Sequence, residues 1–566
     1  MSFKSVYTSK PWLKSYNPGI PAEIEIPEMT IGEAFDQGME RWGDRTAIIF
    51  YGNKITYTQL KEQVDRFATA LHDLGVKQGD TVALFLLNSP QFIIAYFAAL
   101  KLGAIITAIS PIYVAREVKH QIEDSGTKVI ICQDMLYETI ERSEVTLDTV
   151  ILANIGEYLP GAKKLLGKNI LRSVYRQKAQ ISPEVFKRKG FYQFQDLLKK
   201  YAPNPPKVDI DCRQPALLGY TGGTTGLPKG ATLSHYNFIA SAMQDHVFWQ
   251  LDEGKETLIG FLPFYHFYGQ VAVMWGSIVR GYTLIVFTTP DFDDILGAVE
   301  KYKATAFFSV SSMYNRLRDY HKTDRVNWKR LKLIATGGDA LLKDTFDGWR
   351  AKTGTTLCEG LGLTEDCASQ HSSPVGKEKF GSFGVPIPNT VGAIIDSEGT
   401  EFLPVGQVGE VIVKGPQVMI GYWNQPEETK KVLIEIDGET WLRTGDLASM
   451  DEDGYFYFYD RAKDMIKYKG YSVFAREIEE VLVKHPSIKE AGIIGIPDPT
   501  MGQIIKAIVV PHTEARGKIT EEELIDYCKE NLAHYKIPKI LEFRGEIPKT
   551  DVGKVSRREL REEIEL

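Results

Sequence analysis

Helical and strand patterns alternate between residues 30 and 135. Residues 57–74 carry apolar side chains at helical spacing, and residues 81–87 follow as an apolar strand. A second helix is predicted at residues 90–102 and a second strand at residues 104–109. Because repeated alternation of this kind favours a mainly parallel sheet with helices on its faces, the expected fold class is α/β.

The length of the chain and a change of pattern predict the domain organisation. With 566 residues the chain is too long for one compact core. The alternation runs on to about residue 380, where short strands separated by Gly, Pro and Asp turns begin, so a β-rich subdomain is expected there. A charged junction follows Asp460, and the remaining roughly 100 residues are expected to form a small α+β domain. The predicted domains are residues 1–462 and residues 463–566.

Composition and cysteine spacing argue against several classes of function. A net charge of −7 argues against a nucleic-acid partner. The five cysteines are scattered without a CxxC pair, which argues against a disulfide framework and a structural zinc site and fits a reducing compartment. The first residues contain no apolar signal segment, so a cytoplasmic protein is expected.

One apolar stretch, residues 92–109, imitates a membrane span. Lys101 and Gly103 interrupt this stretch, and Pro90 and Pro111 flank it. A core helix followed by a buried strand therefore explains the stretch better than a transmembrane helix does.

Residues 163–189 break the alternation with a concentration of positive charge. They contain nine Lys or Arg residues and a single acidic residue. Lys164, Lys168, Arg172 and Arg176 recur every four residues and would line one face of a helix. Such a helix suits peripheral contact with an anionic membrane, and a solvated helix packed on its own domain explains the pattern equally well.

Residues 220–230 read YTGGTTGLPKG and lie between two short apolar strands. Gly222, Gly223 and Gly226 permit positive φ, so consecutive N–H groups can converge. Lys229 adds a positive charge, and three threonines add hydroxyl donors: Thr221, Thr224 and Thr225. This set of donors suits a polyphosphate, with a flexible surface turn as the alternative. The spacing matches neither a Walker A loop nor a GxGxxG fingerprint.

Seven motifs in order resemble the adenylate-forming superfamily, which comprises acyl-CoA synthetases, nonribosomal-peptide adenylation domains and beetle luciferases. After the glycine-rich loop come FLPFYHFYG (261–269), EGLGLTE (359–365), GEVIVKGPQVMIGYW (409–423), WLRTGDL (441–447), DRAKDMIKYKGYSVFAREIE (460–479) and PKTDVGKVSR (548–557). The series covers nearly the whole chain. The resemblance implies that a carboxylate attacks the α-phosphate of ATP, giving an acyl-adenylate and pyrophosphate. A thiol, that of CoA, then displaces AMP.

The resemblance assigns catalytic roles to four residues. Lys554 matches the adenylation lysine, which a small mobile C-terminal domain carries to the carboxylate and α-phosphate oxygens. Glu365 is expected to hold Mg²⁺, a hard cation that prefers oxygen ligands. Thr364 is expected to bond the α-phosphate, with a helix cap as the alternative role. His266 is expected at the acyl pocket and the opening of the CoA tunnel, with a core histidine as the alternative.

Further residues are implied to bind the nucleotide or to move the small domain. Asp446 and Arg461 resemble the ribose contacts, and Arg461 is expected across a hairpin that turns at residues 451–454. Lys463 matches the hinge, and Lys467 and Gly470 are expected on the loop that the hinge brings to the site. Five residues fall in segments expected around adenine and the acyl chain: Gly338, Asp339, Gly360, Leu361 and Gly362. Leu361 stands where an aromatic residue is usual in this family, and Asp339 is also unusual there.

The implied acid substrate is a medium- to long-chain fatty acid. PWLKSYNPGIPAEIEIP near the N-terminus, SPIYVAREVKHQIEDSG at residues 110–126 and the basic insertion resemble bacterial and archaeal long-chain fatty acyl-CoA synthetases. The alternatives are a CoA ligase for an aryl or short hydroxy acid and a non-catalytic nucleotide-binding regulator. The sequence leaves the oligomeric state open, with a homodimer among the options.

Overall fold

The computed structural model describes residues 3–160, 183–221, 228–338, 341–468, 471–498, 500–549 and 555–565. These residues belong to two compact units. The larger unit comprises Trp12–Val391 and Lys414–Glu435, and the smaller unit comprises Met1–Pro11, Gly392–Val413 and Ile436–Leu566. The expected domain boundary between residues 462 and 463 falls within the smaller unit and stays a prediction.

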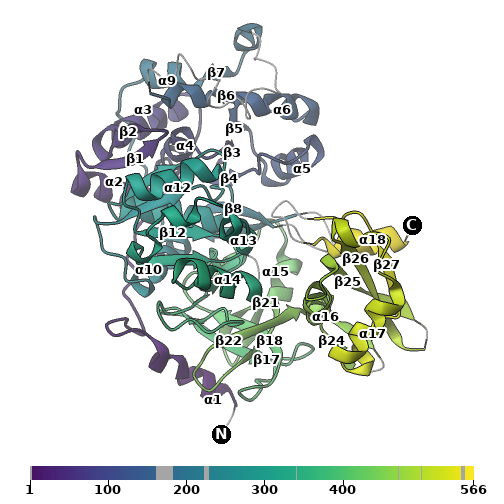
Figure 1. The fold of residues 1–566 in the computed structure, drawn as a ribbon. Helices are drawn as coiled ribbons and strands as arrows, with labels where there is room; N and C mark the ends of the chain where they lie inside the picture. Colours follow the sequence, from purple (N-terminus) through teal and green to yellow (C-terminus); the bar gives the residue numbers. More distant parts are fainter. Residues whose placement is uncertain are drawn as a thin grey trace. The chain divides into compact units, whose positions relative to one another are not determined.

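The larger unit contains an eight-stranded sheet with the order β19-β9-β8-β4-β3-β5-β6-β7. Its strands are β3 (Thr81–Phe85), β4 (Ile105–Ala108), β5 (Val129–Gln133), β6 (Thr149–Ala153), β7 (Phe191–Gln193), β8 (Pro215–Thr221), β9 (Lys229–Ser234) and β19 (Gly421–Tyr422). Neighbours from β8 to β7 run parallel, whereas β9 is antiparallel to both β8 and β19. Figure 1 shows α3 (Tyr57–Asp73), α4 (Pro90–Lys101) and α9 (Phe194–Lys200) on one side of these strands, and α5 (Ala115–Ser125) and α6 (Tyr137–Ser143) on the other. Because helices cover both faces, the central strands β3 and β5 are buried along their whole length.

A second sheet of the larger unit has nine strands in the order β16-β15-β14-β13-β12-β10-β11-β1-β2. Its strands are β1 (Thr46–Phe50), β2 (Asn53–Thr56), β10 (Thr257–Gly260), β11 (Thr283–Val286), β12 (Ala306–Ser309), β13 (Leu333–Thr336), β14 (Cys358–Leu361), β15 (His371–Ser372) and β16 (Val385–Pro386). Neighbours from β1 to β14 run parallel. The connecting helices are α12 (Phe292–Lys301), α13 (Ser311–Asp319) and α14 (Lys343–Thr353). Two largely parallel sheets confirm the α/β class.

The apolar stretch at residues 92–109 is a core helix followed by a buried strand, as predicted. Ser89 caps α4, because its Oγ accepts a hydrogen bond from the Phe92 backbone N–H at 3.3 Å. All residues of α4 before Lys101 are buried, and β4 continues the buried run. Within the described ranges, no helix has the length and apolar character needed to cross a bilayer.

The smaller unit contains most of the strands of two five-stranded sheets. The first has the order β17-β18-β21-β20 with β22 beside β21, and it confirms the β-rich subdomain. Its strands are β17 (Val391–Ile395), β18 (Gly409–Lys414), β20 (Leu433–Ile436), β21 (Glu439–Met450) and β22 (Phe456–Arg461). The second has the order β24-β23-β26-β25 with β27 beside β26. Its strands are β23 (Ile466–Tyr468), β24 (Tyr471–Val473), β25 (Ile488–Asp498), β26 (Gly502–Pro511) and β27 (Ile540–Phe543).

The C-terminal part of the smaller unit has a core of its own. Helices α16 (Ala475–Val483) and α17 (Glu521–Asn531) contribute Leu482 and Leu524 to a buried cluster with β23, β25 and β26. Helix α17 begins at a capping box in which the Thr520 hydroxyl accepts from the Glu523 N–H. The last helix is α18 (Arg557–Glu565). The expected small α+β architecture is therefore present.

Several predictions fall on residues outside the described ranges. The predicted basic helical face, with Lys164, Lys168, Arg172 and Arg176, lies there, as does most of the 163–189 segment. The same holds for a further set of site residues: Gly222, Gly223, Thr224, Thr225, Gly226, Asp339, Gly470 and Lys554.

Candidate active site

The glycine-rich segment joins two paired strands, as predicted. Strands β8 and β9 pair antiparallel, with Tyr220 opposite Gly230 and Thr221 opposite Lys229. The Tyr220 ring lies against the Gly230 backbone, where an added Cβ would come within 3.2 Å of the Tyr220 Cζ atom. Because position 230 has no side chain, the Tyr220 ring can pack directly on the backbone of β9.

Lys229 lies in a small charged cluster. Its ammonium pairs with the Glu428 carboxylate on α15 (Pro426–Val432) and stands 5.3 Å from the centroid of the Tyr422 ring. The hydrogen bond from Lys229, followed by that from Lys431, lowers the pKa of Glu428 to about 2. Glu428 is therefore ionised at any physiological pH and holds Lys229 near the end of β8.

Glu365 belongs to the same cluster through Tyr422. The Tyr422 hydroxyl donates to Glu365 Oε1 at 2.8 Å, and the Met419 backbone N–H donates to the Glu365 carbonyl oxygen at 2.8 Å. Burial comes first and the Glu365 carboxylate second in raising the pKa of Tyr422, so its hydroxyl stays a donor. The structure thus brings two predicted residues, Lys229 and Glu365, beside the same side chain, that of Tyr422.

Thr364 reaches β8 because position 219 carries no side chain. A Cβ at Gly219 would lie 2.4 Å from Thr364 Cγ2 and 2.0 Å from the Phe267 ring. Thr364 begins a short 3₁₀ turn, Thr364–Asp366, in which the Asp366 carboxylate accepts from the Leu363 N–H at 2.7 Å. The side chain that caps this turn is therefore that of Asp366 and not that of Thr364. The predicted phosphate role of Thr364 is compatible with this arrangement.

The backbone after Glu365 is strained, and side chains of a neighbouring helix contact it. Cys367 and Ala368 both adopt the left-handed region, with φ of 55° and 66°. The Ser241 hydroxyl on α10 (His235–Phe248) donates to the Cys367 carbonyl oxygen at 3.0 Å. Two residues after Cys367, Ser369 donates its hydroxyl hydrogen to the buried carboxyl group of Asp245, which lies on the same helix as Ser241. Burial raises the pKa of Asp245 to about 8, so this carboxyl is protonated at neutral pH.

The three residues predicted around adenine, Gly360, Leu361 and Gly362, lie at and just beyond the end of β14. Leu361 pairs with His371 of β15, and Gly360 pairs with Ser372. A Cβ at Gly362 would lie 2.0 Å from the Ala368 carbonyl carbon, so only glycine fits beneath the strained turn. Gly338, at the end of β13, has φ of 73° and is likewise suited to glycine.

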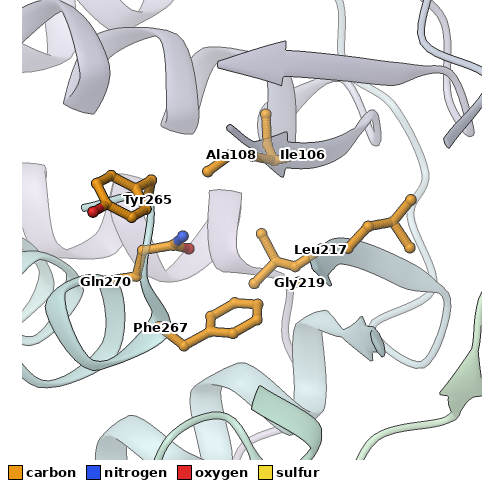
Figure 2. Close-up of a pocket in the computed structure, with 8 residues that line it drawn as sticks. Ile106, Ala108, Leu217, Gly219, Tyr265, Phe267 and Gln270 are labelled. Carbon is orange, nitrogen blue, oxygen red and sulfur yellow. The ribbon is translucent and has the colours of Figure 1, made fainter. Parts of the chain in front are cut away.

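A small pocket lies between strands β4 and β8 of the eight-stranded sheet and residues 265–270. Its lining residues are Ile106, Ala108, Leu217, Leu218, Gly219, Tyr265, Phe267 and Gln270. Figure 2 shows Ala108 and the Phe267 ring on opposite sides of this space, with Gln270 at its flank. His266 lies between two lining residues and is exposed, which excludes the core alternative; its Nδ1 accepts from the Tyr268 N–H at 3.2 Å.

The predicted ribose pair lies in the smaller unit. Asp446 of β21 is directly opposite Arg461 of β22, and Arg461 Nε lies 2.8 Å from Asp446 Oδ1. The Asp451 carbonyl accepts from the Gly454 N–H at 3.0 Å, which closes the predicted turn of this hairpin. The structure therefore pairs the two residues as expected from the turn position.

Lys463 follows β22 and begins the segment that leads into the second sheet. Desolvation comes first and the Arg461 charge second in lowering the pKa of Lys463 to about 8, although the residue as a whole keeps exposed surface. The expectation that Lys467 lies on a loop is wrong. Lys467 is part of β23, paired with Ser472 of β24, and its ammonium lies 3.5 Å from Glu398.

Tyr422, Glu428 and Asp245 were missed by reasoning from sequence alone. Tyr422 stands inside the motif at residues 409–423, and this position was the only available signal. Arg557 was also missed, although it ends the motif at residues 548–557. Its guanidinium pairs with three buried or half-buried carboxylates: Asp460 at 3.1 Å, Asp464 at 3.1 Å and Glu479 at 2.6 Å.

No group of three or more His, Cys, Asp or Glu side chains suited to a metal occurs in the described part of the chain. Glu365 is a single carboxylate, partly buried and oriented by Tyr422. A single oriented carboxylate fits Mg²⁺ that arrives with phosphate oxygens, since Mg²⁺ is commonly held by one or two carboxylates together with substrate phosphates.

The chain matches two family models, "AMP-binding enzyme" at residues 35–423 and "AMP-binding enzyme C-terminal domain" at residues 477–554. It therefore belongs to the AMP-binding enzyme family, and the expected membership of the adenylate-forming superfamily is confirmed.

Relatives of known kind cover the full length of the chain. The chain is 38% identical over 566 residues to a long-chain-fatty-acid–CoA ligase of Bacillus subtilis strain 168, covering 98% of each protein. It is similar to the crystal structure of ATP-bound MatB from Rhodopseudomonas palustris, with a TM-score of 0.80 and 26% identity, over 94% of this chain and 99% of that one. It also resembles the o-succinylbenzoate CoA synthetase MenE from Bacillus subtilis in complex with its acyl-adenylate intermediate, with a TM-score of 0.77 and 25% identity, over 95% and 99% of the two chains.

Proposed function

We propose that the chain is an ATP-dependent acyl-CoA synthetase for medium- to long-chain fatty acids. The carboxylate of the acid attacks the α-phosphorus of ATP, and the bond to pyrophosphate breaks. The CoA thiol then attacks the acyl carbon, losing its proton as the bond to AMP breaks. The long-chain-fatty-acid–CoA ligase that matches over 98% of both proteins supports this substrate class.

The convergence of Lys229 and Glu365 on Tyr422 is the structural observation that carries the proposal. A cation stands over the ring of one tyrosine and a carboxylate accepts from its hydroxyl, next to the paired strands β8 and β9. The Lys229 ammonium can pair directly with the phosphates of ATP. Glu365 would hold Mg²⁺, which neutralises phosphate charge when it is bound. The segment between the strands, with Thr221, Gly222, Gly223, Thr224, Thr225 and Gly226, is assigned the remaining phosphate contacts.

The other predicted residues complete the proposed site. Asp446, paired with Arg461 by 2.8 Å, supplies acceptors for the two ribose hydroxyls. Lys554 supplies the positive charge that assists adenylation, Lys463 is the hinge, and Lys467 and Gly470 serve the thioester-forming step. Five residues are assigned to the surroundings of adenine and the acyl group: Gly338, Asp339, Gly360, Leu361 and Gly362.

The pocket beside Phe267 is assigned to the acyl chain. Most of its lining is apolar, and Gln270 is its single amide. The open space is close to that of one water molecule, so an acyl chain would enter only if lining side chains moved. His266, exposed next to it, is assigned to the approach of CoA. We further propose that the enzyme is cytoplasmic and that residues 163–189 contact an anionic membrane peripherally.

Release of pyrophosphate tests the proposed function. The purified chain is supplied with MgATP and a panel of saturated fatty acids, aryl acids and short hydroxy acids, each with and without CoA. The expected result is release that depends on fatty acids of medium to long chain, with acyl-CoA formed only when CoA is present. Preference for aryl or short acids would support the alternative ligase, and ATP binding without release would support a nucleotide-binding regulator.

A further inference from the structure

One face of helix α10 contacts the backbone that follows Glu365. Ser241 and Asp245 are four residues apart, so their side chains lie one above the other on the helix. The Ser241 hydroxyl donates to the Cys367 carbonyl oxygen at 3.0 Å, and Asp245 accepts the hydroxyl hydrogen of Ser369. Two side chains of one helix face therefore bind two nearby points of the same short turn.

The peptide group that joins Cys367 to Ala368 is bound at both of its polar atoms. Its carbonyl oxygen accepts from Ser241, and its N–H donates to the Leu363 carbonyl oxygen at 2.6 Å. The second of these bonds closes the loop of chain that contains Glu365. Ser241 is therefore connected, through a single peptide group, to the loop that carries the proposed Mg²⁺ residue.

This peptide group lies between two residues of unfavourable backbone conformation. Cys367 and Ala368 have φ of 55° and 66°, a region that a side chain with a Cβ atom disfavours. The direction of the carbonyl between them depends on ψ of Cys367 and φ of Ala368. A donor that fixes this carbonyl therefore helps to keep both residues in a conformation that persists only when the surroundings enforce it.

Helix α10 is itself fixed in the core. It begins at a capping box in which the Ser234 hydroxyl accepts from the Asn237 N–H at 3.0 Å. Along the helix, Phe238, Ile239 and Ala242 are buried. The polar face of α10 is therefore presented by a rigid element.

The same face of α10 also contacts the chain on the other side of Glu365. Asn237, four residues before Ser241, donates its side-chain amide to the Pro416 carbonyl oxygen at 2.8 Å. Three residues after Pro416, the Met419 N–H donates to the Glu365 carbonyl oxygen at 2.8 Å. The helix therefore supports the backbone of Glu365 through two separate segments.

We propose that Ser241 and Asp245 are positioning residues for Mg²⁺ binding: they keep the Glu365 carboxylate where the ion arrives with ATP, without touching the ion or the nucleotide. This inference rests on the proposed function, which assigns Mg²⁺ to Glu365. A binding group that is held in place before its ligand arrives loses less conformational freedom on binding. Loss of either contact lets the strained turn relax and displaces the carboxylate.

Four variants test the proposal. Ser241→Ala removes the donor to the strained peptide group. Asp245→Ala removes the acceptor for Ser369, whereas Asp245→Asn keeps an oxygen that can accept there. Ser277→Ala on α11 (Gly276–Val279) is the matched control, because it removes a fully buried hydroxyl that has no hydrogen-bond partner among the described residues.

The Kd for ATP is measured by isothermal titration calorimetry without acid substrate, once with Mg²⁺ and once with EDTA. The quantity compared is the factor by which Mg²⁺ lowers this Kd. Ser241→Ala and Asp245→Ala are each expected to reduce the factor about fivefold, the value of one ordinary hydrogen bond. The Kd in EDTA is expected to stay within about twofold of the wild-type value. Asp245→Asn and Ser277→Ala are expected to match the wild type.

A glycine variant tests whether the strained turn transmits the effect. Ala368→Gly removes the Cβ atom that disfavours the left-handed conformation, so the peptide group needs less support from α10. Added to Ser241→Ala, this change is expected to restore part of the lost Mg²⁺ effect. Equal losses in the single and the double variant would contradict transmission through the turn.

A wild-type Mg²⁺ factor in both alanine variants would overturn the proposal, as would a Kd that rises equally with and without Mg²⁺ or a wild type that ignores Mg²⁺. If an alanine variant fails to fold, Ser369→Ala decides, because it removes the bond to Asp245 and leaves α10 unchanged. The proposed function can fail separately: a wild type that binds MgATP but releases no pyrophosphate with any fatty acid refutes that function, while the calorimetric series still decides on Ser241 and Asp245.

Discussion

Tyr422 donates its hydroxyl hydrogen to Glu365 Oε1 at 2.8 Å while its ring faces the Lys229 ammonium at 5.3 Å. One side chain therefore contacts both the carboxylate and the cation of the proposed phosphate site. Because β19 pairs with β9, Tyr422 is held in register with Ala231, two residues past Lys229. The strand pairing thus fixes the place of Tyr422 relative to the strand that carries Lys229.

Tyr422→Phe keeps the ring beside Lys229 and removes only the hydroxyl. Loss of a hydrogen bond to a charged group is expected to lower the rate of adenylation about tenfold and to raise the Mg²⁺ concentration needed for half-maximal rate. Initial rates of pyrophosphate release across a Mg²⁺ titration check this. The matched control is Tyr302→Phe at the end of α12, and an unchanged Mg²⁺ requirement in Tyr422→Phe would argue against Glu365 as the metal-holding residue.

Lys554→Ala removes the charge proposed for the first half-reaction. Adenylation is expected to fall about 10²–10⁴-fold, the range for loss of one electrostatic stabiliser. Formation of acyl-CoA from supplied acyl-adenylate is expected to persist, because that step does not use this lysine. Single-turnover assays of each step separate the two, with Lys549→Ala as the control, and parallel loss of both steps contradicts the assignment.

Lys463→Pro tests the proposed hinge. Proline fixes φ near −65°, so a residue that must change its backbone conformation between two steps is locked in one of them. Adenylation is expected to persist and transfer to CoA to fail. Both half-reactions are measured on the same preparation. A similar loss in each would show that position 463 serves stability rather than movement.

Asp245→Asn tests the buried carboxyl behind the strained turn. The pKa of Asp245 is raised from 3.8 to about 8, so the folded protein keeps a proton that the unfolded chain releases above about pH 4. The free energy of unfolding of the wild type therefore falls as the pH rises from about 4 to about 8. Asparagine carries no such proton, so the free energy of unfolding of the variant is expected to rise relative to that of the wild type across this window, with about 6 kcal/mol as the upper bound.

Urea titrations at pH 5 and pH 8 measure that difference. The control is Asp347→Asn on α14, where the aspartate side chain is 56% exposed. The free energy of unfolding of this variant is expected to differ from that of the wild type by the same amount at pH 5 and pH 8. A difference between wild type and Asp245→Asn that does not change with pH would show that Asp245 is ionised in the folded protein.

Local patterns predicted the elements, and turn positions predicted some pairings. The turn at residues 451–454 was enough to place Arg461 opposite Asp446, because a hairpin fixes the register of its strands. The glycines between β8 and β9 likewise predicted that a loop joins these two strands. The apolar run at residues 92–109 was interpreted correctly because a charge and a glycine interrupt it.

The supporting contacts could not be predicted from sequence. Tyr422 meets Glu365 across 57 residues, and Ser369 meets Asp245 across 124. No spacing rule relates residues so far apart, since their meeting depends on how two sheets and α10 pack. Lys467 was placed on a loop because the family resemblance implied a loop after the hinge, whereas the β23–β24 pairing extends to Tyr468 and Tyr471.

Lys229 is already paired with the Glu428 carboxylate, so any anion that binds this lysine must replace that carboxylate. A phosphate group that takes Lys229 as its partner displaces a carboxylate, and Glu428 remains paired with Lys431. The lysine therefore contributes only the difference between two ion pairs, which favours a newcomer with more negative charge than one carboxylate. A free fatty acid carries a single carboxylate and so would gain little at this position, which we propose is occupied by the phosphates of the nucleotide.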